Sequence, residues 1–244
     1  MDTSLKDGER LDKIGFGGLS IIQKPEEFCY GIDAVLLADF AKLKAGSRAI
    51  DLGTGTGIIP LILSYKTVDT ELWGVEIQES SWERSVRTAK FNGLSDRLHF
   101  ICDDIKNAPD VFGLNTFDAV TTNPPYNGYE SGLKNANMAK YISRHETTAT
   151  IEDFIAVSSN LLRNHGDFYM IHRPSRLVDI FFYARAYSLE PKEIKFVAPN
   201  RNRLPNLVLI HCVKNGGSEL KLLDTLYVYN EKGGYTSELE RIYE

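Results

Sequence analysis

The sequence predicts an α/β fold: a mostly parallel sheet of seven strands, with an antiparallel last strand and helices on both faces. Apolar stretches of strand length alternate with amphipathic stretches of helix length along most of the chain, as in repeated strand–helix–strand units. The first unit opens with a glycine-rich turn. Polar side chains follow successive strands, and such sheets bind ligands at the carboxyl ends of their strands.

The N-terminal 30 residues carry few regular signals. Their apolar run, Leu19 to Ile22, lies between two glycines and Pro25 and favours a strand pair folded over the main body. We therefore expect an N-terminal extension at residues 1–30 and one domain at residues 31–244. A helix is predicted from Asp33 to residue 43, with Asp33 as its cap. The turn before it is of a kind that lies against a ligand, so Tyr30 and Asp33 are candidate cofactor contacts.

Residues 49–65 are predicted to form a strand, a glycine turn and a helix. Four candidate cofactor residues follow one another here: Asp51, Gly53, Gly55 and Gly57. Glycine lets the backbone approach a ligand where a Cβ would collide. The G-x-G-x-G spacing differs from the dinucleotide and P-loop patterns, and no lysine follows to meet a phosphate. The next strand, residues 72–77, places Glu76 where a carboxylate can bind both ribose hydroxyls. These features favour an adenosyl ligand without phosphates.

A third strand end carries two further candidates. A helix at residues 80–92 and a strand at residues 98–102 are followed by Asp103 and Asp104. One of these aspartates can accept a hydrogen bond from an adenine amino group, while the other caps a turn or helix. The sequence leaves the choice open.

The fourth strand, residues 117–122, leads into Asn123-Pro124-Pro125-Tyr126 at the same edge. The prolines lack an N–H and hold the segment out of helical geometry, so its carbonyls are free to face a ligand. The Asn123 side-chain oxygen and the Pro124 carbonyl can accept both hydrogens of a planar amine and draw its nitrogen toward tetrahedral geometry. Pro125 and Tyr126 are candidate substrate contacts, Tyr126 by stacking on a base. A rigid turn is the alternative interpretation.

The C-terminal half supplies the rest of the sheet. We predict a substrate-covering loop at residues 127–138, helices at 151–163 and 177–187, and strands at 167–171, 195–198 and 207–213. The last two strands are expected to form an antiparallel hairpin across residues 200–203, and the tail after residue 218 to pack back on the domain.

Positive charge is concentrated between residues 163 and 203, although the whole chain carries −5. Eight basic residues stand there against four acidic ones. This excess is compatible with a phosphate-binding face, with Arg173, Arg201 and Arg203 as candidate RNA contacts. A solvated helix face would show the same pattern.

Other classes of protein are disfavoured. No apolar run is long enough for a membrane span, and the first residues lack the pattern of a signal peptide, so we expect a cytoplasmic protein. Three widely spaced cysteines argue against a disulfide framework and against a zinc site.

Two sets of motifs resemble known enzymes. The first resembles the Rossmann-like, class I methyltransferases that use S-adenosylmethionine to modify exocyclic or amide nitrogens: Asp51-x-Gly53-x-Gly55-x-Gly57, Glu76, Asp104 and Asn123-Pro124-Pro125-Tyr126. The second resembles the bacterial tRNA1(Val) adenine-N6 methyltransferase family: Glu9–Asp12, Tyr30–Leu37, Gly57–Ser64, Gly74–Glu79, Arg144–Glu146 and His172–Pro174.

The resemblance implies a cofactor, a partner and a reaction. S-adenosylmethionine would give its methyl group to N6 of an adenine beside the anticodon of a tRNA, without a metal. Asn123, Pro124 and Tyr126 would be catalytic, and Asn123 would also touch the cofactor. Enzymes acting on protein glutamine or on guanine N2 in rRNA carry the same or a closely related tetrapeptide and are alternatives. A module that binds the cofactor or RNA without catalysis is another.

Overall fold

The computed structural model describes residues 4–27, 29–126 and 149–243. The predicted substrate-covering loop, at residues 127–138, and the motif Arg144–Glu146 lie outside the described residues. Within them, no helix is long and apolar enough to cross a membrane.

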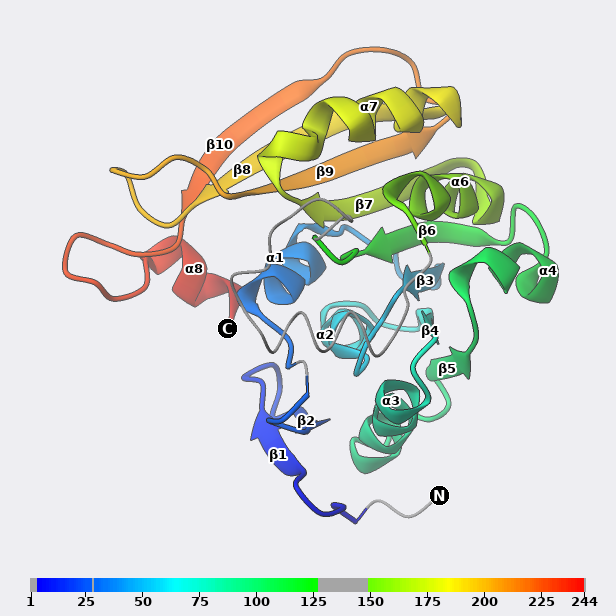
Figure 1. Ribbon diagram of the computed structural model, residues 1–244, viewed down its shortest axis with the longest axis vertical. Helices are drawn as coiled ribbons and strands as arrows, with labels where there is room; N and C mark the ends of the chain where they lie inside the picture. Colours follow the sequence, from blue (N-terminus) through cyan, green and yellow to red (C-terminus); the bar gives the residue numbers. More distant parts are fainter. Residues whose placement is uncertain (1–3, 28, 127–148, 244) are drawn as a thin grey trace.

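A sheet of eight strands organises the chain, in the order β10-β8-β9-β7-β6-β3-β4-β5 (Figure 1). Its strands are β3 (Arg48–Leu52), β4 (Glu71–Glu76), β5 (Leu98–Cys102), β6 (Phe117–Thr122), β7 (Leu162–His172), β8 (Leu189–Ala198), β9 (Leu207–Lys214) and β10 (Lys221–Tyr227). The seven predicted strands are all present. β9 runs antiparallel to its neighbours β7 and β8, so the predicted hairpin and the antiparallel last strand of the seven are confirmed.

The sheet has one strand more than predicted. β10 lies in the segment expected only to pack back, and it pairs in parallel with β8. It forms an edge of the sheet, and Leu226 is its one buried side chain. An edge strand with so little burial leaves no continuous apolar run in the sequence, and this is why it was missed.

Helices cover both faces of the sheet (Figure 1). They are α1 (Ile32–Phe40), α2 (Ile58–Lys66), α3 (Glu79–Phe91), α4 (Ala108–Phe112), α6 (Ile151–Leu161), α7 (Leu177–Ala186) and α8 (Ser237–Ile242), with short 3-10 turns η1 (Ile105–Asn107) and η2 (Pro174–Arg176). Successive side chains of β7 point to opposite faces of the sheet and belong to two separate hydrophobic cores. Tyr169 and Ile171 pack with α1, α2 and α8, whereas Phe168 and Met170 pack with α6 and α7. This alternation follows from the two-residue period of a strand.

Helix α1 differs from its predicted bounds. Its N-cap is Gly31, so Asp33 lies in the first turn and the predicted capping role of Asp33 is wrong. The helix ends at Phe40 because Ala41 is already extended, with φ −70° and ψ 119°. The Asp33 carboxylate is thereby available to another part of the chain.

The N-terminal segment forms the expected strand pair, β1 (Arg10–Lys13) and β2 (Ser20–Gln23), in antiparallel register. β2 lies against α3, where the Ile22 N–H donates to the Thr88 hydroxyl at 3.1 Å. A buried ion pair between Glu9 and Arg87 joins the start of the segment to the same helix. The pair is therefore fixed to the side of the domain that carries the glycine turn.

Candidate active site

Three neighbouring strands bring the glycine turn, Glu76 and Asn123 to one level of the sheet. β3 pairs in parallel with β6 and with β4, and Leu52 lies opposite both Thr122 and Val75. Gly53, Asn123 and Glu76 each follow one of these three paired residues. Because paired strands lie about 4.8 Å apart, the three positions form a contiguous row at the carboxyl edge. The predicted convergence at the centre of the sheet is confirmed.

The glycine turn exposes its backbone at one position and packs tightly at another. Gly53, Gly55 and Gly57 have φ angles of +71°, +57° and +81°. A Cβ on Gly57 would lie 2.8 Å from the Phe100 ring, so close packing requires this glycine. A Cβ on Gly55 would meet no atom within 4 Å. The turn is therefore open at Gly55, where a ligand can approach the backbone.

Glu76 holds the glycine turn in place. Its buried carboxylate accepts hydrogen bonds from the N–H of Gly55 at 2.8 Å and from the N–H of Gln78 at 2.9 Å. Burial raises the pKa of this carboxyl, although the two backbone donors oppose that effect. A carboxylate oxygen accepts more than one hydrogen bond, so Glu76 can orient the turn and still bind hydroxyl groups.

Asp51 is a buried acid with one unused oxygen. Its Oδ1 accepts a hydrogen bond from the Thr121 hydroxyl at 2.7 Å, and its Oδ2 has no partner among the described residues. Burial raises the pKa of Asp51 to about 7; the neighbouring Thr121 and Thr54 hydroxyls only partly oppose this, and the charge of Glu76 adds to it. An unpaired buried carboxylate oxygen beside an open backbone turn fits a ligand that carries positive charge.

The N-terminal strand pair reaches this turn through Gln23, a residue that the sequence did not indicate. Its buried side chain donates to the Thr56 hydroxyl at 2.8 Å and accepts from the Tyr30 N–H at 3.2 Å. In the sequence, Gln23 is visible only as a polar residue that follows the apolar pair Ile21-Ile22. Its burial in the structure shows that it has a structural role. Tyr30, a candidate cofactor contact, is thus placed near the glycine turn by its backbone.

The two aspartates after β5 have different local partners. The Asp104 carboxylate accepts from the Lys106 N–H at 3.0 Å and caps η1. The Asp103 carboxylate accepts from the Asp104 N–H at 2.7 Å and from the Asn107 amide at 2.8 Å. The Asp103 N–H also donates to the Glu76 carbonyl at 3.1 Å. Both side chains hold this turn beside Glu76, and each remains a candidate for the adenine contact.

Tyr126 is held by partners from distant parts of the chain. Its hydroxyl lies 2.8 Å from Asp33 Oδ2 and 2.8 Å from Asn123 Oδ1. A phenol has one hydrogen, so it donates to one of these acceptors at a time. Burial, reinforced by the charge of Asp33, raises the pKa of Tyr126 and keeps the phenol neutral. Asp33 therefore contacts the tetrapeptide, a partner that no local pattern indicated.

His172 and Arg173 complete the surroundings of Tyr126. The His172 ring meets the Tyr126 ring edge-on at 5.2 Å between centroids, and the Arg173 guanidinium carbon lies 5.6 Å from the same ring centre. His172 is completely buried, and burial lowers its pKa to about 4, so the ring is neutral at pH 7. Its Nδ1 accepts from the Arg173 N–H at 2.8 Å, so the ring hydrogen is on Nε2. Within the tetrapeptide, Pro124 is buried and Pro125 is exposed.

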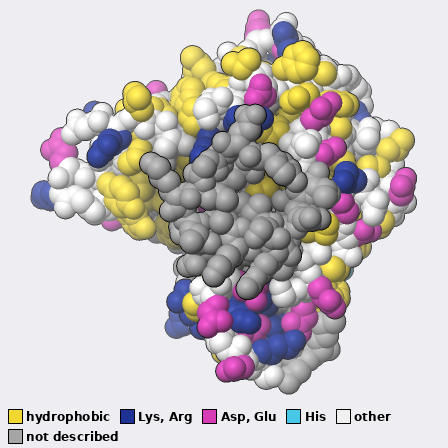
Figure 2. Space-filling view, in the orientation of Figure 1, with side chains coloured by type: hydrophobic (Ala, Val, Ile, Leu, Met, Phe, Trp, Pro, Cys, Tyr) yellow, Lys and Arg dark blue, Asp and Glu magenta, His cyan; other side chains and the backbone are white. Residues whose placement is uncertain are grey.

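The positive charge between residues 163 and 203 is partly neutralised in the structure. Several of these basic residues form ion pairs: Arg163 with Asp118, Arg176 with Asp179, Arg185 with Glu190 and Lys195 with Glu238. In Figure 2 acidic and basic side chains alternate over the visible face. Arg173, Arg201 and Arg203 are exposed and form no ion pair with a described acid. The predicted RNA contacts are thus available for binding: Arg201 and Arg203 share the turn between β8 and β9, and Arg173 follows β7.

The described residues contain no group of three or more His, Cys, Asp or Glu side chains that could hold a metal ion.

Comparisons with known proteins agree with this arrangement. A family model described as methyltransferase small domain matches residues 19–178. The tRNA1(Val) (adenine(37)-N6)-methyltransferase of Porphyromonas gingivalis is 29% identical over 222 residues, which cover 88% of this chain and 86% of that protein. The protein of the same name from Mannheimia succiniciproducens is 27% identical over 217 residues, covering 85% of this chain and 83% of its own.

Solved structures share the fold. A predicted O-methyltransferase from Agrobacterium tumefaciens superposes with a TM-score of 0.70 at 20% identity, covering 86% of this chain and 95% of that one. Geranyl diphosphate C-methyltransferase from Streptomyces coelicolor, solved with S-adenosyl-L-homocysteine, superposes with a TM-score of 0.56 at 14% identity, covering 75% and 80%. These likenesses establish the Rossmann-like, class I methyltransferase fold.

Proposed function

The chain belongs to the methyltransferase small domain family, and from that membership we propose that it transfers a methyl group from S-adenosylmethionine to N6 of an adenine in tRNA. The observation that carries the proposal is the row formed by Gly53, Glu76 and Asn123 on three paired strands. This row would put a nucleoside pocket beside an amine clamp at one sheet edge, as methyl transfer requires.

The cofactor would occupy the open side of the glycine turn. Glu76 would accept the ribose hydroxyls, and the space over Gly55 would admit the ligand close to the backbone. Asp103 or Asp104 would accept from the adenine amino group, with Tyr30 and Gln23 supporting the turn. S-adenosylmethionine is a sulfonium cation, and the buried carboxylates of Asp51 and Glu76 favour a bound cation over the neutral product.

The tetrapeptide would position the accepting amine. The Asn123 side-chain oxygen and the Pro124 carbonyl would accept its two hydrogens, so that its lone pair points at the methyl carbon. When bound, the cofactor would supply the methyl group and leave as a neutral thioether that keeps the electron pair of the broken S–C bond, and the amino proton would go to water. No strong base is needed. In the structure Asn123 Oδ1 lies 2.8 Å from the Tyr126 hydroxyl, so this contact must yield when an amine binds.

Tyr126 would supply the face on which the target base stacks. Asp33, His172 and Arg173 surround the ring, and a ring fixed in advance loses little freedom when a base binds. The base must leave its own stack, which costs a few kcal/mol and least in an unpaired loop. Because the relatives are named for adenine 37 of tRNA1(Val), an anticodon-loop adenine is the substrate we propose. The setting would be the cytoplasm, where tRNA is modified.

A labelling experiment tests this proposal. The protein is incubated with methyl-labelled S-adenosylmethionine and either total tRNA or total protein from cells lacking it, with Asn123→Ala as the matched inactive variant. We expect label in tRNA with the wild type and none with the variant. Label in protein and not in tRNA would identify a glutamine methyltransferase instead, and no label with correctly bound cofactor would indicate a binding module.

A further inference from the structure

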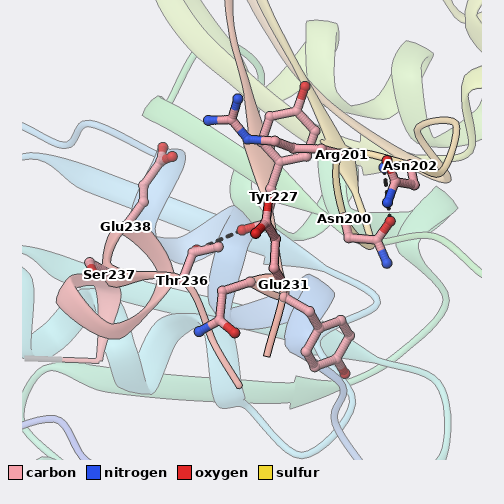
Figure 3. Close-up of a pocket in the computed structure, with 10 residues that line it drawn as sticks. Asn200, Arg201, Asn202, Tyr227, Glu231, Thr236, Ser237 and Glu238 are labelled. Carbon is pink, nitrogen blue, oxygen red and sulfur yellow. Dashed lines mark hydrogen bonds between the residues drawn. The ribbon is translucent and has the colours of Figure 1, made fainter. Parts of the chain in front are cut away.

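A pocket of about 620 Å³ lies beyond the carboxyl ends of β8 and β10 (Figure 3). The turn after β8, at residues 200–202, and parts of the segment 227–238 line it. β8 and β10 run in the same direction as β6, so the pocket lies at the edge of the sheet that carries Asn123. β8 and β10 are three and four strand positions from β6, or roughly 15–20 Å at about 4.8 Å a strand. The pocket is therefore distinct from the candidate active site.

Aromatic rings form one wall of this pocket and are fixed from behind. Tyr229 lines the pocket with 44% of its surface exposed, and its ring stacks on Tyr235 at 5.7 Å between centroids. Tyr235 lies parallel to Tyr243 at 6.5 Å, and Tyr243 stacks on the buried Phe16 at 5.9 Å. This series of rings runs from the pocket into the core. The Tyr229 ring is thus held at one orientation before any ligand arrives.

A guanidinium group and amide groups face the same space. The Arg201 guanidinium carbon lies 5.5 Å from the centre of the Tyr227 ring, and Figure 3 shows the two side chains side by side. Asn200 and Asn202 contribute amide side chains. Two acids also line the pocket: Glu238 forms an ion pair with Lys195 at 2.7 Å, and Arg201 offsets the charge of Glu231, so these four side chains carry no net charge.

We propose that this pocket binds a second unstacked nucleotide of the RNA substrate, a few positions along the loop from the methylated adenine. Aromatic faces stack on bases, amides hydrogen-bond to base edges and a guanidinium pairs with a phosphate. An anticodon loop offers several unpaired bases, so a second one can be extruded at small cost. The inference rests on the proposed function for the identity of the RNA, and it assigns the C-terminal segment a role in substrate recognition.

Direct RNA binding tests the pocket. The probe is a fluorescein-labelled stem-loop with the anticodon-loop sequence of a tRNA(Val), titrated with full-length protein. Tyr229→Leu should raise the Kd for this RNA roughly five- to 100-fold, since stacking of one base is lost. Tyr229→Phe keeps the aromatic ring and should bind like the wild type. Arg201→Ala should also weaken binding and lower its salt dependence. Arg163→Ala removes the same charge at the opposite edge of the sheet, where Asp118 pairs with it, and should bind like the wild type.

Binding of S-adenosylmethionine by each variant shows that it is folded. A crosslink between a 4-thiouridine-substituted stem-loop and the wild-type peptide around Tyr229 gives an independent positive result. If Tyr229→Leu binds the stem-loop RNA as tightly as the wild type, the proposal is overturned. If only Arg201→Ala weakens RNA binding, the pocket makes a phosphate contact without base stacking, and the proposal is overturned as well. Methylation of the same RNA is measured in parallel, with Asn123→Ala as its control. If the wild type methylates the RNA but the pocket variants bind normally, the pocket proposal fails and the proposed function stands.

Discussion

Replacing Asp51 by asparagine should stabilise the unliganded protein while impairing cofactor binding. Burial raises the pKa of Asp51 from 3.8 to about 7. At pH 8 the carboxylate is ionised in both states, and its charge is less stable in the folded state than in the unfolded state. The difference of about three pH units corresponds to about 4 kcal/mol of destabilisation at pH 8. Asparagine removes the charge and still accepts from Thr121, but its buried NH₂ group lacks a partner, which costs about 1–3 kcal/mol. The net expected gain at pH 8 is about 1–3 kcal/mol.

The stability gained by Asp51→Asn should depend on pH, because the effect of removing the charge depends on pH and the cost of the unpaired NH₂ group does not. Unfolded Asp51 ionises near pH 4 and folded Asp51 near pH 7, so the unfolded state binds fewer protons in this window and wild-type stability falls as pH rises through it. The advantage of Asp51→Asn should grow by about 2–3 kcal/mol between pH 5 and pH 8. Urea unfolding of both proteins at these two pH values measures it.

Protein stability favours a neutral residue at position 51, whereas binding of the cofactor should favour an ionised Asp51. Ionised Asp51 attracts a cationic ligand, so the affinity of the wild type for S-adenosylmethionine should increase with pH up to about 7 and then level off. Asp51→Asn should bind weakly and without that dependence, as calorimetric titration would show. A stability difference that is the same at pH 5 and pH 8 would refute the reasoning, because it would mean that no ionisation of Asp51 is suppressed by folding.

Three further changes give separate tests. Gly55 and Gly57 both have a positive φ, so alanine at either position costs about 1–2 kcal/mol of backbone strain. Gly57→Ala also places a Cβ 2.8 Å from Phe100 and should cost about 1–3 kcal/mol more in thermal unfolding, whereas Gly55→Ala meets no atom within 4 Å and should in addition mainly lose cofactor affinity; equal stability losses would contradict the packing analysis. Tyr126→Phe keeps the stacking ring and should retain most RNA affinity, and Tyr126→Ala should lose roughly five- to 100-fold; equal affinities would exclude stacking. Charge reversal of Arg173 and Arg203 together should weaken tRNA binding and flatten its salt dependence, with cofactor affinity unchanged, and unaltered tRNA binding would remove both from the interface.

The alternation of strands and helices and the ligand edge were predictable because they depend on local signals. Each apolar strand ends in a glycine or polar residue, and parallel strands must present those ends together. The contact between Asp33 and Tyr126 joins residues 93 positions apart, and Gln23 reaches Thr56 across 33 positions. No periodicity records such pairings, so the sequence predicted a capping role for Asp33 that the structure does not show, and it did not indicate Gln23.

The same reason limits what the charge count over residues 163–203 can predict. Counting charges over residues 163–203 cannot show that the Arg163 side chain meets Asp118, or that Lys195 meets Glu238 from the last helix. Sequence gives the number of charges, whereas the tertiary contacts decide which remain available to a phosphate. Arg173, Arg201 and Arg203 are exposed and form no ion pair with a described acid, so their charges remain available.

The most direct test identifies the methylated atom. Purified wild-type protein and Asn123→Ala are incubated with unmodified tRNA(Val) and S-adenosylmethionine, and the RNA is digested to nucleosides for mass spectrometry. Alignment of the amine clamp with the cofactor crevice predicts N6-methyladenosine with the wild type and none with Asn123→Ala. Methylation of guanine N2, or equal product from both proteins, would contradict it.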